Sequence, residues 1–121
     1  MIGFIGGGKM AEALIKGITS KGNKNIFVSE PIEERRLYLE STYGIKASAS
    51  NKEVADSCRV IILAVKPQNM AAVLAEIAAS ITGDKTVVSI AAGITLAFLE
   101  EKLKTRKLVR VMPNTPAIVQ E

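Results

Sequence analysis

Residues 1–17 read MIGFIGGGKMAEALIKG, and this stretch decides the fold. An apolar run over residues 1–5 leads into three consecutive glycines, and Met10, Leu14 and Ile18 then form an apolar stripe at helical spacing. The pattern predicts a β-strand, a tight turn and an α-helix at the start of the chain.

The spacing Gly6-x-Gly8-x-x-Ala11 fits the dinucleotide fingerprint G-x-G-x-x-G/A. Gly6 permits a sharp turn out of the strand, Gly8 has no Cβ to hold a diphosphate away, and Ala11 lets the helix pack closely on the sheet. A diphosphate would lie at the helix N-terminus, where unpaired N–H groups and the positive end of the helix dipole attract anions. The alternative is a glycine-rich turn without a ligand, and the flanking strand and helix patterns favour the dinucleotide site.

Composition indicates one globular domain with an aliphatic core, because the 121 residues are 48% hydrophobic and only 4% aromatic. The net charge of +4 is spread along the chain, and no basic block is longer than two residues, as in Arg35-Arg36. Without aromatic residues interleaved among basic ones, the sequence argues against a nucleic-acid-binding platform.

The single cysteine and the absence of histidine exclude several chemistries. A histidine-based triad, a histidine general base and a zinc site of the usual His/Cys type cannot be built from this chain alone, so we expect no metal site. Cys58 borders an apolar run, which predicts a buried, inert thiol in preference to a nucleophile. The first apolar run is too short for a signal peptide, and no run approaches the ~20 apolar residues of a membrane span. We therefore expect a cytoplasmic protein that does not bind membranes.

Apolar, β-branched runs alternate with helical patterns along the chain. We expect strands at 1–5, 25–29, 45–48, 59–65, 86–91 and 108–112, with helical patterns between them near 10–18, 32–43, 51–57, 70–81 and 96–103. Gly44 should end one helix, and Ser50 or Asn51 and Thr95 should cap two others. Six strands that alternate with helices predict one α/β domain over residues 1–121, a doubly wound, Rossmann-like parallel sheet with right-handed crossovers.

Glu30 lies 24 positions after Gly6, at a predicted strand end where dinucleotide folds place an acid for the adenosine ribose. A carboxylate there would accept hydrogen bonds from the ribose hydroxyls and repel a 2′-phosphate, which favours NAD over NADP. Arg35 and Arg36 could instead neutralise such a phosphate, although a solvated helix face is the simpler interpretation of both. The alternative for Glu30 is a solvated carboxylate near a helix N-terminus.

The turn at 64–67 follows the most continuously apolar run of the chain and should border the same crevice as the glycines. Lys66 in this turn could pair with a phosphate or a substrate carboxylate, or it could simply face solvent. The pair Ala92-Gly93 follows another strand and lets the backbone approach a ligand closely.

Four stretches carry a family likeness: IGFIGGGKMAEALIKG at 2–17, AVKPQ at 64–68, VVSIAAGI at 87–94 and RVMPNTPA at 110–117. In this order and spacing they resemble the N-terminal domain of pyrroline-5-carboxylate reductases, which reduce a cyclic imine to proline with a nicotinamide cofactor. The resemblance spans the whole chain and implies NADPH or NADH as cofactor. It implies that the dinucleotide is held by Gly6, Gly7, Gly8, Lys9, Met10, Glu30, Asn51, Ala64, Val65, Lys66, Pro67, Ile90, Ala91 and Ala92.

The resemblance also implies that the nicotinamide lies toward Ala91-Ala92 and the Asn114-Thr115 loop. A lysine at position 9, where the family often has asparagine or glutamine, adds a cation beside the diphosphate. Members of the family bind the imine mostly through a second, all-helical domain that also forms the dimer. We therefore expect Glu121 to fall near a domain junction, and the homo-oligomer to form through that other domain.

Three functions remain open. The first is hydride transfer from NAD(P)H to 1-pyrroline-5-carboxylate, which gives L-proline, with no catalytic residue assigned within this chain. The second is a different NAD(P)-dependent reductase of the same architecture that acts on a hydroxyacid or a deazaflavin. The third is a module that senses NAD(H) without chemistry, for which the sequence contains no recognition helix.

Overall fold

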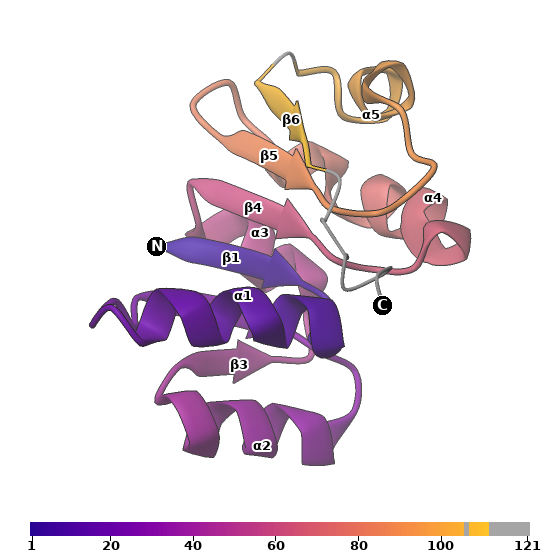
Figure 1. The fold of residues 1–121 in the computed structure, drawn as a ribbon. Coiled ribbons are helices and arrows are strands. Elements are labelled where there is room, and N and C mark those ends of the chain that lie inside the picture. The colour runs from indigo at the N-terminus through magenta and orange to yellow at the C-terminus, as the bar shows by residue number, and fades with distance from the viewer. Residues whose placement is uncertain (106, 112–121) are drawn as a thin grey trace, which may run out of the picture.

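The computed structural model describes residues 1–105 and 107–111. The strands are β1 (Ile2–Ile5), β2 (Ile26–Ser29), β3 (Lys46–Ser48), β4 (Val60–Leu63), β5 (Thr86–Ser89) and β6 (Leu108–Arg110). All five pairings between them are parallel, and they form one sheet in the order β3-β2-β1-β4-β5-β6 (Figure 1). This confirms the predicted single α/β domain with a doubly wound, Rossmann-like sheet.

Helices connect the strands. They are α1 (Lys9–Thr19), α2 (Glu33–Tyr43), α3 (Asn51–Ser57), α4 (Pro67–Ile77), the short 3₁₀-helix η1 (Ala78–Ser80) and α5 (Leu96–Leu103). Over the described residues, no helix combines the length and the apolar character that crossing a membrane requires.

The predicted helix ends are confirmed. Gly44 ends α2 in the left-handed conformation at φ 69°, which glycine adopts without steric cost. The Ser50 side chain accepts a hydrogen bond from Glu53 N at 3.0 Å, and Thr95 accepts one from Phe98 N at 3.1 Å. Each cap satisfies a backbone donor that the first helical turn leaves unpaired.

Apolar side chains on both faces of the sheet pack against the helices and form two clusters. On one face, Phe4 and Val28 pack with Ile15 of α1 and Leu39 of α2. On the other face, the described helices α3, α4 and α5 bury the larger cluster, which includes Cys58. Burial raises the pKa of the Cys58 thiol, in agreement with the predicted inert cysteine.

The side of α1 that packs on the sheet is not the side of the predicted apolar stripe. Ala11 and Ile15 are fully buried, whereas Met10 and Leu14 of the apolar stripe stay 42% and 40% exposed. The reason is that the apolar cluster under α1 and α2 involves β1–β3 and Ile62 of β4, and it includes no described residue of β5 or β6. Val109 of β6, which lies on the uncovered face by register, is likewise 45% exposed.

The central strands are shorter than their apolar runs. The run at 59–65 forms a strand only over Val60–Leu63, and the run at 86–91 only over Thr86–Ser89. The residues left over at the carboxyl ends are therefore free to line a cavity at this edge of the sheet. The predicted residue Met112 and the proline-rich segment 113–116 lie outside the described residues.

Candidate functional site

The turn between β1 and α1 begins with a glycine that no other residue can easily replace. Gly6 has a φ of +102°, a conformation that side chains disfavour. A Cβ on Gly6 would lie 2.9 Å from the backbone oxygen of Ala64. The N–H of Gly6 donates a hydrogen bond to Ser29 O at 2.9 Å. Gly6 therefore packs the turn against both neighbouring strands.

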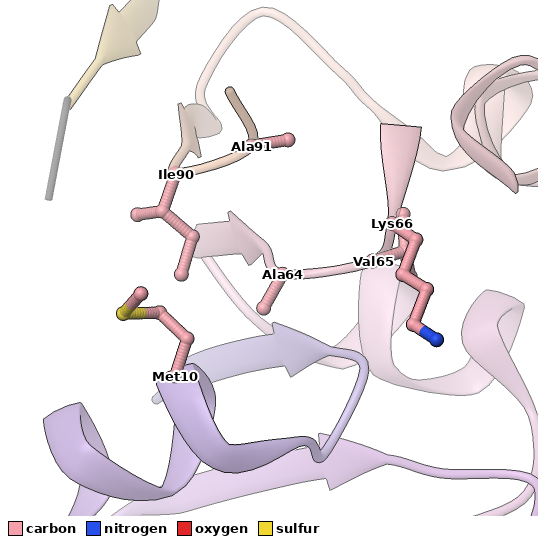
Figure 2. A pocket seen from close by; sticks show the side chains of 6 residues that line it. All are labelled: Met10, Ala64, Val65, Lys66, Ile90 and Ala91. Carbon is pink, nitrogen blue, oxygen red and sulfur yellow. The ribbon is translucent and has the colours of Figure 1, made fainter. Parts of the chain in front are cut away.

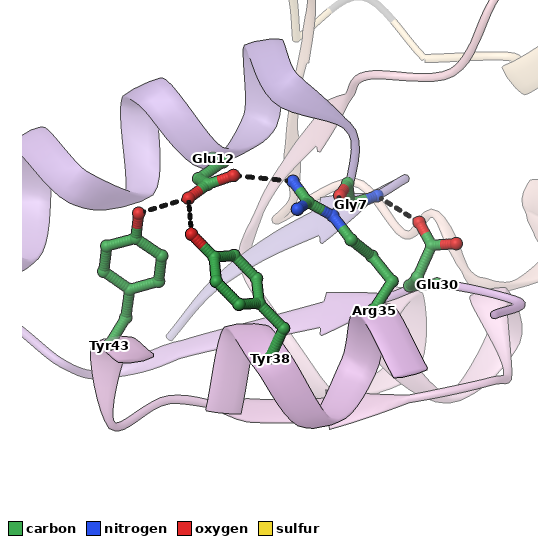
Figure 3. Close-up of polar contacts among 6 residues, drawn as sticks. All are labelled: Gly7, Glu12, Glu30, Arg35, Tyr38 and Tyr43. Carbon is green, nitrogen blue, oxygen red and sulfur yellow. Dashed lines mark hydrogen bonds and ion pairs between the residues drawn. The ribbon is translucent and has the colours of Figure 1, made fainter. Parts of the chain in front are cut away.

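Both backbone polar groups of the next residue are bound by side chains. Gly7 N donates to Oε1 of Glu30 at 3.0 Å, and Gly7 O accepts from Nε of Arg35 at 2.7 Å (Figure 3). A Cβ on buried Gly7 would lie 2.9 Å from Leu39 Cδ1 and 3.1 Å from Glu30 Oε1. The second glycine is thus enclosed by protein on the side of α2.

The third glycine faces open space. A Cβ on Gly8 would meet no heavy atom within 4 Å among the described residues, and Gly8 precedes the first turn of α1 without a side-chain cap. Its N–H donates to no protein acceptor in the part of the chain that the structure describes. The N–H groups of Lys9 and Met10 also lack partners within the helix, because they belong to its first turn. This open cradle at the positive end of a helix suits a phosphate group.

A groove of about 370 Å³ opens beside this cradle. It runs from the glycine turn to the loops after β2 and β4. It is lined by Gly6, Gly7, Gly8, Glu30, Pro31, Ile32, Ala64, Val65, Lys66 and Asn69.

A second cavity, of about 130 Å³, adjoins the groove and shares Ala64, Val65 and Lys66 with it (Figure 2). Its remaining lining comes from Met10, Ile90 and Ala91, so its walls are mostly apolar. The predicted crevice between the glycine turn and the turn at 64–67 is therefore present, and the chain after β2 and β5 borders it as well.

Glu30 lies directly after β2 and is only 8% exposed. Its Oε1 accepts from Gly7 N, and its Oε2 accepts from Ile32 N at 3.1 Å. Each carboxylate oxygen can accept a further hydrogen bond, because it has two lone pairs. Glu30 therefore fixes the glycine turn and still faces the groove.

A polar cluster behind the glycine turn joins α1 to α2 (Figure 3). Glu12 accepts from Arg35 Nη2 at 2.7 Å, from Tyr38 at 2.6 Å and from Tyr43 at 2.5 Å. The hydroxyl of Tyr38, then that of Tyr43, then Arg35 lower the pKa of Glu12 to about 2. The interpretation of Arg35 and Arg36 as a solvated helix face is wrong. Arg35 binds Glu12, and Arg36 donates a hydrogen bond to Glu30 O at 2.8 Å.

The structure brings most of the expected site residues together. Four of the expected site residues line neither cavity: Lys9, Asn51, Pro67 and Ala92. Lys9 and Ala92 are exposed nearby, and Pro67 opens α4. Asn51 opens α3, where its amide binds Ser29 and Glu76. The Asn114-Thr115 loop lies outside the described residues.

Three lining residues were not anticipated: Pro31, Ile32 and Asn69. Pro31 and Ile32 directly follow Glu30, and Asn69 lies in the first turn of α4, three residues after Lys66. The rule that ligands bind beyond the carboxyl ends of parallel strands includes these first turns and could have identified them. The cluster around Glu12 gives no such local signal, because Arg35, Tyr38 and Tyr43 lie 23 to 31 residues away from Glu12.

Chemically, this arrangement binds and orients a ligand. Glu30 and Lys66 are the ionisable side chains that line the two cavities within the described residues. They offer one anionic and one cationic contact around exposed backbone amides, while the second cavity offers an apolar wall. An elongated ligand with a phosphate near its centre fits this distribution of groups.

Comparison with known proteins identifies the family. Residues 1–93 match the family model described as "NADP oxidoreductase coenzyme F420-dependent". The chain is 42% identical to pyrroline-5-carboxylate reductase 3 of Rattus norvegicus over 99% of this chain and 45% of that protein. It therefore spans less than half the length of this relative.

Solved structures agree. A pyrroline-5-carboxylate reductase from Coxiella burnetii matches with a TM-score of 0.90 and 32% identity, over 98% of this chain and 45% of that one. The Plasmodium falciparum pyrroline carboxylate reductase with NADP bound matches with a TM-score of 0.79 and 32% identity, over 98% of this chain and 44% of that one. The chain therefore belongs to the family of coenzyme F420-dependent NADP oxidoreductases, and over nearly its whole length it is similar to the NAD(P)-binding part of pyrroline-5-carboxylate reductases.

Proposed function

We propose that this chain is the cofactor-binding part of a pyrroline-5-carboxylate reductase. The complete enzyme would transfer hydride from NAD(P)H to the cyclic imine 1-pyrroline-5-carboxylate and give L-proline, the last step of proline biosynthesis. The similarity to such reductases over 98–99% of the chain supports the substrate class. The observation that carries the binding role is the open cradle at Gly8.

The residues present fit a nicotinamide dinucleotide. The backbone amides from Gly8 to Met10 would hold the diphosphate, and Glu30 would accept hydrogen bonds from the adenosine ribose. The apolar cavity beside Ile90 and Ala91 would take the nicotinamide. When bound, the cofactor supplies the hydride, and the chain supplies its binding and orientation.

The chain's own contribution to the reaction is alignment. A protonated imine is already a good electrophile, so the step depends mainly on a donor-to-acceptor distance of about 3–3.5 Å and on the exclusion of water. Apolar walls at Met10 and Ile90 would exclude water from that end of the site. We propose that the imine binds mainly to the other part of the enzyme, which would also form the oligomer, and that the enzyme works in the cytoplasm.

The cradle is tested by adding one methyl group to it. Gly8→Ala should abolish the binding of NADH and NADPH in calorimetric titration, because the new Cβ occupies the space for the diphosphate. Gly17→Ala is the matched control, since Gly17 also has no heavy atom within 4 Å of its Cβ position but lies in the exposed part of α1. Wild-type affinity in Gly8→Ala would refute the placement of the diphosphate.

Cofactor preference is tested at Glu30. We expect the wild-type chain to bind NADH more tightly than NADPH, because the carboxylate repels a 2′-phosphate. Glu30→Gln removes the charge and keeps one oxygen that can accept from Gly7 N. Its amide nitrogen cannot accept from Ile32 N, and the loss of that second bond should weaken the binding of NADH and NADPH alike, so the ratio of the two affinities is the readout. If the ratio of the two affinities does not shift toward NADPH in this variant, Glu30 does not set the preference.

The division of labour is tested by assay. We expect the chain by itself to bind nucleotide but to form proline slowly or not at all from NAD(P)H and 1-pyrroline-5-carboxylate. Rapid proline formation by these 121 residues would show that the imine site lies within them.

The family description favours a second candidate, a reductase that exchanges hydride between NADP and a deazaflavin coenzyme. The two candidates share the dinucleotide site and differ in the second substrate. Assay of the complete enzyme with the imine and with the deazaflavin separates them, and we expect the imine to be reduced.

A further inference from the structure

Arg35 joins the glycine turn to both flanking helices. It lies on α2, donates from Nε to Gly7 O at 2.7 Å, and donates from Nη2 to Glu12 of α1 at 2.7 Å (Figure 3). Its side chain is only 26% exposed, and it lines neither cavity. Arg35 therefore acts on the turn from behind, without facing the groove.

The guanidinium group is itself held in place. Its central carbon lies 5.1 Å from the centre of the Tyr38 ring, a cation–π distance. Glu12 balances its charge and is fixed by the hydroxyls of Tyr38 and Tyr43. A planar fork held on several sides loses little further freedom when it binds a carbonyl.

The bond to Gly7 O also controls the next N–H. The carbonyl of Gly7 and the N–H of Gly8 belong to one planar trans peptide, so they point in opposite directions. Because Arg35 holds the carbonyl on the α2 side, the N–H of Gly8 points to the opposite side, away from Arg35. Glycines on both sides of this peptide offer no Cβ that would resist its rotation.

We propose that Arg35 is a positioning residue that orients the Gly7–Gly8 peptide so that the Gly8 N–H is ready to bind a diphosphate. This inference rests on the proposed function, which puts the diphosphate at Gly8. Without the guanidinium, Gly7 O loses its partner and the peptide can rotate. The cradle then loses a donor whose direction was set before the ligand arrived.

The experiment compares Arg35→Met with Arg36→Met. Arg36 is the matched control, because it is the neighbouring residue and its Nη1 binds Glu30 O and Pro31 O instead of the glycine turn. In Arg35→Met, the Kd for NADH and for ADP should rise by about 10- to 100-fold, as for a lost hydrogen bond to a charged group. The Kd for adenosine, which lacks phosphate, should change by less than about twofold. In Arg36→Met, any change in Kd should be equal for NADH and adenosine, because Arg36 holds the backbone beside the ribose-binding Glu30 and does not touch the glycine turn.

A second readout needs no ligand. In wild-type protein the backbone amide of Gly8 should give one sharp signal in a ¹H–¹⁵N NMR spectrum, and in Arg35→Met this signal should broaden or split as the peptide rotates. If wild-type protein binds no NADH, the proposed function fails, and the Gly8 signal still decides the role of Arg35.

Two results would overturn the proposal: an unchanged Gly8 signal with unchanged NADH affinity, or an equal loss of affinity for NADH and adenosine. If Arg35→Met does not fold, Arg35→Lys serves instead. It keeps the charge but cannot bind Gly7 O and Glu12 with one fork. Its Kd for NADH should lie between the wild-type value and the value expected when the bond to Gly7 O is lost completely.

Discussion

The first two glycines of the turn and the third glycine lie side by side in sequence but in opposite surroundings. Protein atoms enclose Gly6 and Gly7, whereas Gly8 borders an open groove. The fold itself requires the first two, because a side chain there would strike the backbone of Ala64, directly after β4, or the side chains of Leu39 and Glu30. The described fold places no such demand on the third, and under the proposed function the bound diphosphate would require it. One residue type therefore serves two different purposes in consecutive positions, and substitution can separate them.

The largest effect on stability is expected at Gly6. Gly6→Ala places a Cβ in a left-handed conformation and 2.9 Å from a backbone oxygen that cannot move without the strand. We expect the free energy of unfolding to fall by about 2–5 kcal/mol in urea titration. A loss below about 1 kcal/mol would mean that the turn relaxes easily. It would contradict the conclusion that the fold requires Gly6 more strictly than Gly8.

Gly7→Ala should have the next largest effect. Its Cβ would meet Leu39 Cδ1 at 2.9 Å, and a side-chain atom can move more easily than backbone. We expect a loss of about 1–3 kcal/mol in the same titration. A loss greater than that of Gly6→Ala would indicate that the contact with α2, and not the turn conformation, dominates the enclosed side.

The polar cluster behind Gly7 should make this enclosed side sensitive to pH. The pKa of Glu12 is lowered from 4.5 to about 2, so its contribution to stability is present above pH 4.5 and is lost as the pH falls toward 2. The effect should be smaller than those of the glycine variants, because the carboxylate is partly exposed and screened by solvent. Wild type should lose more stability than Glu12→Gln between pH 5 and 2, measured by urea midpoints; parallel curves would contradict this.

The same cluster sets an alkaline limit. The pKa of Tyr43 is raised above its ordinary value of 10.0, chiefly because its hydroxyl donates to Glu12. Its contribution is therefore complete below pH 10 and is lost at higher pH, since the unfolded chain ionises first. Above pH 10, the free energy of unfolding of Tyr43→Phe, measured by urea titration, should fall less with rising pH than that of wild type.

The smallest effect is expected on the open side. Gly8→Ala should cost at most about 1 kcal/mol, the difference between glycine and alanine at a helix N-cap, since its backbone angles suit any residue. Gly17→Ala should instead stabilise the chain by about 0.5–1 kcal/mol, because glycine weakens a helix interior. Urea titration of both variants checks this order. A large loss in Gly8→Ala would show that the third glycine is also needed by the fold.

Much of the site could be predicted from the sequence. The fingerprint located the turn, and the strand ends brought Glu30, Lys66 and Ala91 to one edge of the sheet. The exposed stripe of α1 could not be predicted, because periodicity shows that a helix has an apolar side but not how much of the sheet lies under it. The interpretation of Arg35 as solvated was wrong for a related reason: its partners lie on α1 and in the glycine turn.

The sequence by itself determined the elements, their alternation and the place of the glycine turn, because these depend on interactions between residues close in the chain. Hydrophobic period, glycine conformation and capping groups act over a few residues and can be recognised there. Only the tertiary structure decided that Gly7 is enclosed while Gly8 is open, and that Glu12 joins Arg35 to two tyrosines. Those contacts depend on how α2 packs beside α1, which is set by the whole sheet and leaves no local pattern.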